Sequence, residues 1–82
     1  MNALYEHLRK NAPKSWHISI HTNKQGAYLR ILYRRYIIYF YENGCIEDVS
    51  LYYTHHAIII KFYNTLHMLL TRYNMKNEVT LL

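Results

Sequence analysis

The sequence predicts an α+β fold: a two-layer sandwich of a short N-terminal helix, a three- or four-stranded antiparallel sheet and a long C-terminal amphipathic helix. Apolar residues recur at helical spacing near the start of the chain and again after residue 54. Between these segments the chain alternates with a period of two or is rich in β-branched and aromatic residues, as strands are. The order helix, strands, helix is typical of a two-layer domain.

Residues 3–11 form the first predicted helix. Leu4 and Leu8 lie one helical turn apart, Asn2 precedes them as a candidate N-cap, and Pro13 prevents the helix from continuing.

The first predicted strand covers residues 15–21, where Trp16 and Ile18 alternate with polar neighbours. The polar segment 22–26 ends in glycine and leads into another β-prone run, so we expect a hairpin loop there.

For residues 27–42 the sequence predicts either one long, bent strand or two strands. The segment contains no turn former, and its alternation is clean only as far as Arg34. A bulge or break at Arg34-Arg35 explains this change, because one extra residue exchanges the two faces. Asn43-Gly44 is a strong hairpin signal, and residues 45–53 are the predicted returning strand.

The C-terminal helix begins after Thr54, which is its predicted cap, and residues 74–82 are predicted to be a loosely held tail. A wide apolar stripe indicates the side that packs on the sheet. The stripe consists of Ile58, Ile59, Phe62, Tyr63, Leu66, Leu69, Leu70 and Tyr73.

Length and composition favour one small domain spanning residues 1–82. The chain has 82 residues, of which 51% are hydrophobic and 18% charged, so it can bury a core but not two. A single cysteine excludes an internal disulfide and a cysteine-based zinc site. The charged N-terminal segment does not resemble a signal peptide, and the most apolar segment, 57–70, is too short to span a bilayer. We therefore expect a cytoplasmic protein.

Charge and tyrosine content point to a binding surface. The net charge is +5, ten residues are tyrosine, and residues 1–41 hold seven basic residues against one acid. Arginine beside aromatic rings is enriched at protein interfaces and also binds phosphates and bases. The alternative is an ordinary solvated sheet face whose tyrosines reflect β-propensity and base composition. The candidate partner-binding residues are His17, His21, Tyr28, Arg30, Arg34, Arg35 and Tyr36.

No metal, cofactor or catalytic site is expected. His17 and His21 lie about 13 Å apart along a strand at ~3.3 Å per residue, too far to bind one ion together. No phosphate-binding loop, nucleophile elbow or paired-carboxylate motif is present. A metal-free nuclease using His17, His21 and Arg30 is chemically conceivable, but the sequence favours a protein that is not an enzyme.

The order of elements is similar to that of double-stranded-RNA-binding domains at the level of fold. The basic stretch that those domains carry at the start of their last helix is replaced here by Thr54-His55-His56-Ala57-Ile58. No family assignment follows from this similarity.

The sequence favours a small binding protein that docks on a larger protein or nucleoprotein complex and occludes it, as accessory and inhibitor proteins of phages and mobile elements do. The alternative is a nucleic-acid-binding regulator that uses a basic, tyrosine-rich sheet face. A second copy of the chain is a further candidate partner, because two helices can cover only one face of a sheet that is apolar on both.

Overall fold

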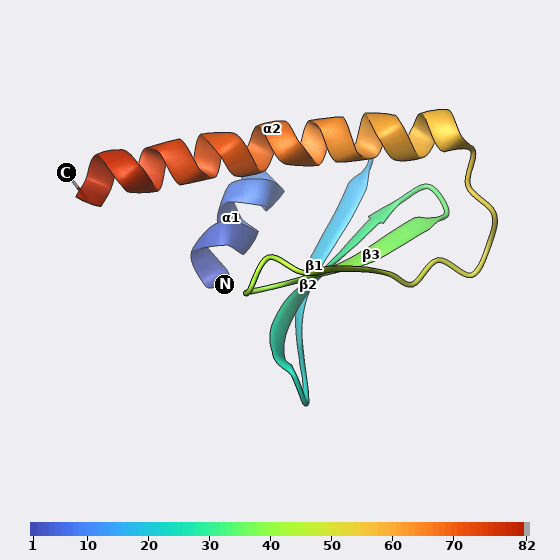
Figure 1. Ribbon diagram of the computed structural model, residues 1–82, viewed down its shortest axis with the longest axis horizontal. Coiled ribbons are helices and arrows are strands. Elements are labelled where there is room, and N and C mark those ends of the chain that lie inside the picture. The colour runs from blue at the N-terminus through green and yellow to red at the C-terminus, as the bar shows by residue number, and fades with distance from the viewer. Residues whose placement is uncertain (82) are drawn as a thin grey trace.

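Within residues 1–81, two helices cover one side of a four-stranded antiparallel sheet (Figure 1). The computed structural model describes the backbone of residues 1–81 and the side chains of residues 1–75. The strands lie in chain order across the sheet, so the predicted α+β class and antiparallel sheet are confirmed. The elements are α1 (Asn2–Asn11), β1 (Trp16–Asn23), β2 (Gly26–Tyr33), β3 (Tyr36–Tyr41), β4 (Ile46–Asp48) and α2 (His56–Leu81).

Helix α1 lies beneath the C-terminal half of α2 (Figure 1). It begins at Asn2, one residue earlier than predicted, and Met1 occupies the N-cap position without a side-chain hydrogen bond. The prediction that Asn2 caps the helix is therefore wrong. At the other end the Asn11 side chain donates a 2.8 Å hydrogen bond to the carbonyl of His7, and Ala12 is extended.

The β1–β2 connection is a tight hairpin whose tip projects away from α2 (Figure 1). Asn23 pairs with Gly26, so two residues form the turn, and Gly26 has φ +111°. The Asn23 side chain accepts a 2.8 Å hydrogen bond from the backbone N–H of Gln25. The predicted hairpin is present with a shorter loop than the polar segment indicated.

The segment 27–42 forms two strands, which resolves the alternative that the sequence left open. Tyr33 pairs with Tyr36, so Arg34 and Arg35 alone form the turn, and Arg34 has φ +56°. A positive φ at the first but not the second central residue is the pattern of a type II′ turn, which usually places glycine there. The turn also exchanges odd and even positions, so the core-facing residues are odd-numbered in β2 and even-numbered in β3.

Strand β4 is much shorter than the predicted strand 45–53, because its pairing with β3 ends at Asp48. Beyond it the Ser50 hydroxyl accepts a 2.8 Å hydrogen bond from the backbone N–H of Ile37, and residues 49–55 form no regular element. The predicted Thr54 cap is wrong: α2 begins at His56, and the His55 ring accepts a 3.2 Å hydrogen bond from the N–H of Ala57.

Helix α2 presents its predicted stripe to the sheet and closes the core. Phe62, Leu66 and Leu69 are each 1% exposed. The Phe62 ring lies 4.5 Å from the Trp16 ring and 5.3 Å from the Tyr36 ring, measured between centroids. Where a tail is predicted, the backbone stays helical through Leu81; the side chains of 76–82 lie outside the described residues. The buried core consists of Leu8, Trp16, Leu29, Ile31, Tyr36, Ile38, Phe40, Phe62, Leu66 and Leu69.

Replacement of either central α2 residue tests this packing. We expect Phe62→Ala to lower the free energy of unfolding by about 3–5 kcal/mol and Leu66→Ala by about 2–5 kcal/mol, because each leaves a cavity in a small core. Met68→Ala is the matched control on the same helix, since Met68 is 44% exposed, and it should cost less than about 0.5 kcal/mol. Equal losses for all three variants in urea titrations would contradict the assigned buried side.

The strained turn is tested by glycine substitution. Arg34→Gly should raise the free energy of unfolding by up to ~1.5 kcal/mol. Relief of a left-handed arginine, worth about 1–2 kcal/mol, exceeds the ~0.5–1 kcal/mol of added chain entropy. Arg35→Gly, at a position without positive φ, should be destabilising. The turn geometry is wrong if thermal melting shows the same loss for both variants.

The buried Tyr36 hydroxyl donates a 3.0 Å hydrogen bond to the Tyr63 hydroxyl. Burial, followed by this contact, raises the pKa of Tyr36 well above its ordinary value. Above about pH 10 the unfolded chain therefore releases a proton that the folded chain keeps, so stability falls as pH rises. In Tyr36→Phe this slope should be shallower by up to about 1.4 kcal/mol per pH unit. If denaturant titrations from pH 10 upward give the same pH slope for wild type and Tyr36→Phe, the raised pKa of Tyr36 is wrong.

Candidate functional site

The side of the sheet opposite the helices is a continuous surface that the described part of the chain does not cover. Directly paired residues on adjacent antiparallel strands point to the same side, so the strand register defines three rows across it. We call this surface the open face. Its rows are His21, Tyr28 and Tyr41; Ser19, Arg30, Tyr39 and Glu47; and His17, Leu32 and Ile37.

Aromatic rings pack against one another at the centre of the open face. The Tyr28 ring centroid lies 4.5 Å from that of Tyr39, 5.5 Å from that of Tyr41 and 5.6 Å from that of His21. Partial burial of the phenol, followed by the charge and hydrogen bond of Tyr39, raises the pKa of Tyr28. The Tyr28 hydroxyl therefore keeps its proton to a higher pH than an ordinary tyrosine does.

Hydrogen bonds hold the edge of this cluster in place. The Tyr41 hydroxyl donates to a Glu47 carboxylate oxygen at 3.2 Å, and the Asn23 amide reaches the same hydroxyl at 3.5 Å. Tyr41 is only 9% exposed although it lies on the uncovered side. The side chains of the cluster are thus held by packing and hydrogen bonds, so they have little conformational entropy left to lose in a contact.

The open face carries little net charge. Arg30 and Glu47 lie in the same row, separated by Tyr39, and no other Lys, Arg, Asp or Glu belongs to the three rows. The other described basic side chains lie elsewhere: on or after α1, at the two hairpin turns and on α2. The basic excess of the first half of the chain is therefore dispersed over the molecule.

The structure brings together four of the seven predicted contact residues. His17, His21, Tyr28 and Arg30 share the open face. Arg34 and Arg35 are exposed but form the β2–β3 turn at one end of the sheet, because the chain reverses there.

Tyr36 does not belong to the contact surface. It is 3% exposed and packs on Phe62 in the core, since the turn places it on the helix side. Tyr39 and Tyr41 belong to the open face but were not among the predicted contacts. A sequence-level signal existed, since apolar residues at alternate positions after residue 35 indicate a second hydrophobic face. Recognition of the turn was needed to place this face beside Tyr28 and Arg30.

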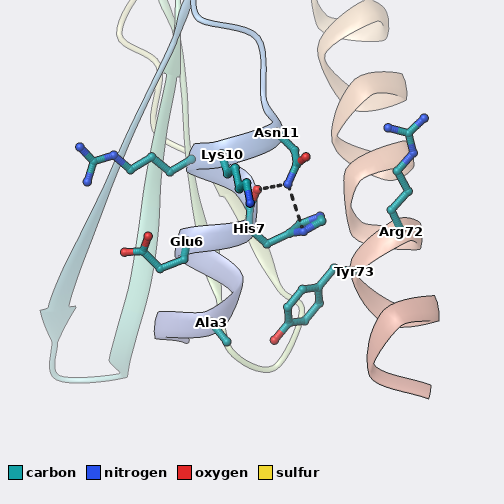
Figure 2. A pocket seen from close by; sticks show the side chains of 8 residues that line it. Ala3, Glu6, His7, Lys10, Asn11, Arg72 and Tyr73 are labelled. Atoms are coloured by element: carbon teal, nitrogen blue, oxygen red, sulfur yellow. Dashed lines mark hydrogen bonds between the residues drawn. The ribbon is translucent and has the colours of Figure 1, made fainter. Parts of the chain in front are cut away.

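A second concave region lies between α1 and α2, with a volume of about 900 Å³ (Figure 2). His7 points from α1 toward α2; its Nε2 lies 3.0 Å from the carbonyl oxygen of Leu69, and its ring packs on Tyr73 at 5.3 Å. Arg72 and Lys10 are among the residues that line it. The His7 contacts account for this groove as helix-to-helix packing.

The open face contains a serine beside a histidine. The Ser19 hydroxyl lies 2.8 Å from Nε2 of His21, but no described carboxylate orients that ring, as an activated serine requires. Among the described residues, no group of three or more His, Cys, Asp or Glu is arranged to hold a metal ion. In the same range no helix has the length and hydropathy needed to cross a membrane.

Comparison of the chain with protein-family models, with curated proteins and with solved structures found no match.

Proposed function

We propose that this is a non-enzymatic binding protein that docks through its open face on a larger partner protein and thereby occludes part of the partner's surface. The observation that carries the proposal is the ordered aromatic cluster on the side of the sheet that the helices leave uncovered. Accessory and inhibitor proteins of phages and mobile elements act in this way, since occupying a surface requires no catalytic group.

The composition of the open face favours a protein partner. Tyrosine offers a large contact area with few rotatable bonds, and tyrosine and arginine are the residue types enriched at binding hot spots. The rings of Tyr28 and Tyr39 lie beside Arg30 at the centre of the face, where a partner excludes water most completely. Glu47 adds an opposite charge, so the face is suited to a partner of mixed polarity.

Nucleic acid is the less favoured partner for this face. A phosphate backbone requires several cations along its path, whereas the open face presents Arg30 together with the negative charge of Glu47. The basic, tyrosine-rich sheet face of the alternative hypothesis is thus tyrosine-rich but not basic.

Docking of a second copy of the chain on the open face is a further prediction from the sequence. The large side chains of the open face are buried or half-buried by one another, so a single chain does not expose a wide apolar patch. The large apolar side chains in the exposed class lie elsewhere: Ile20, Ile46, Leu51, Tyr52, Tyr53, Ile60, Met68 and Met75.

Affinity capture with paired variants tests the docking proposal. Arg30→Glu/Tyr39→Ala alters the centre of the open face, and Lys61→Glu/Ile60→Ala makes the same kinds of change on the exposed side of α2. We expect wild type and the α2 variant to retain one partner protein from a nuclease-treated lysate of the native host. The open-face variant should bind it at least about tenfold more weakly, because hot-spot residues each contribute about 2 kcal/mol or more.

Three outcomes would contradict the proposal, provided that thermal melting shows both variants to be folded. The first is that the open-face variant captures the partner as well as wild type does. The second is that nuclease treatment abolishes capture, which assigns the partner to nucleic acid. The third is that sedimentation equilibrium shows wild type as a dimer and the open-face variant as a monomer, which assigns the face to a second copy.

A further inference from the structure

A second candidate surface lies where the β2–β3 turn approaches the start of α2, at the end of the molecule distant from α1 (Figure 1). A cavity of about 430 Å³ is present there. Its wall combines two guanidinium groups, an aromatic ring, an imidazole and a hydroxyl, and contains no carboxylate. The lining residues are Arg34, Arg35, Tyr53, Thr54, His55 and Ile58.

The loop that forms one wall exposes large side chains to an unusual degree. Leu51, Tyr52 and Tyr53 are 86%, 65% and 87% exposed. The guanidinium carbon of Arg35 lies 5.5 Å from the centroid of the Tyr52 ring. Tyr53 lines the same cavity as Arg34 and Arg35, and its exposed ring offers a surface on which a planar ligand group can stack.

The positive charge at this end is not neutralised within the described side chains. Their only ion pair joins the Met1 amino group to Glu42, so neither Arg34 nor Arg35 is held by a carboxylate. The first turn of α2 contains no acidic residue, so the positive end of its dipole adds to the local potential.

Two further features single out this site. Thr54 lines the cavity, and its buried hydroxyl has no hydrogen-bond partner among the described residues, which is uncommon for a buried polar group. Arg34 occupies a backbone conformation that glycine adopts more easily. The fold therefore carries strain at a position that places a cation beside the cavity.

We propose that this cavity binds a nucleotide of a single-stranded nucleic acid, with Arg34 and Arg35 on the phosphate and Tyr53 stacked on the base. Cations next to exposed aromatic rings are the combination that single strands require. An acidic protein segment would use the arginines but has no planar group for the exposed ring. The site is distinct from the open face, and the two together suit a nucleoprotein partner.

Fluorescence anisotropy with a labelled 12-nucleotide oligothymidylate, measured over a salt series, tests this proposal. We expect wild type to bind with an affinity that falls as salt rises. Arg34→Gly/Arg35→Gln should weaken binding at least about tenfold at low salt and reduce the slope of log K against log salt by about 1.4, the value for two single-strand phosphate contacts. Glycine at residue 34 suits the native φ, so this variant should fold.

Two further variants test whether the Tyr53 ring stacks on a base and whether the effect of the arginine variant exceeds that of a general loss of charge. Tyr53→Ala should weaken binding about fivefold or more with an unchanged salt slope, because stacking does not depend on counterions. Lys24→Gln/Lys61→Gln lowers the net charge equally at two distant exposed positions and should bind nearly as wild type does.

The proposal is overturned if wild type fails to bind at 50 mM salt, or if the lysine variant loses as much affinity as the arginine variant. It is also overturned if polyglutamate competes as well as the oligonucleotide and Tyr53→Ala has no effect, which would identify an acidic protein segment. None of these results bears on docking through the open face, since Arg30 and Tyr39 are intact in every variant.

Discussion

A single long helix can bury only one side of the sheet, and this limit organises the whole molecule. Phe62, Leu66 and Leu69 of α2, together with Leu8 of α1, pack on one side of β1–β3. Contact with that side supplies most of the apolar burial that stabilises so small a chain. Within the described part of the chain no second layer covers the other side, and its tyrosines pack against one another. The core residues and the tyrosine cluster thereby lie on opposite faces of the same strands.

The two-residue turn at Arg34-Arg35 determines which side chains reach which face. With one residue more or fewer, Tyr36, Ile38 and Phe40 would point away from α2, and the side chains of Ile37 and Tyr39 would meet the helix instead. The turn is therefore the point where the hydrophobic pattern of β3 is aligned with that of β2. It contains an arginine with positive φ where glycine is usual, so the same feature that sets the register displays two cations at the end of the sheet.

The sequence predicted the elements whose signals are local. The apolar stripe of α2 and the alternation from Trp16 onward identified a helix and a strand, because burial of one side enforces the period. The sequence did not decide whether the strand bulges or breaks at Arg34-Arg35, because neither residue is a turn former. The strained φ of Arg34 is held by a tertiary constraint. Strand β4 ends early because Ser50 bonds to the backbone of Ile37, a long-range contact without a sequence signal.

The candidate surface was predicted in part for the same reason. His17, His21, Tyr28 and Arg30 follow from alternation along two strands and their hairpin, and the structure places them together. Tyr36 was misassigned because its side depends on the number of residues in the turn. Tyrosine content alone does not separate core from surface: Tyr36 is 3% exposed and Tyr53 is 87% exposed.

Hydroxyl-radical footprinting of the tyrosines, read by mass spectrometry on the dilute protein, tests most directly whether one side of the sheet is free. Tyr36 is the internal reference for a ring buried under α2. If the open face is uncovered, Tyr28 and Tyr39 are oxidised clearly faster than Tyr36, and they become protected only when a partner is added. Protection of all three to the same extent in the free protein would contradict the account, because a second layer would then cover the face.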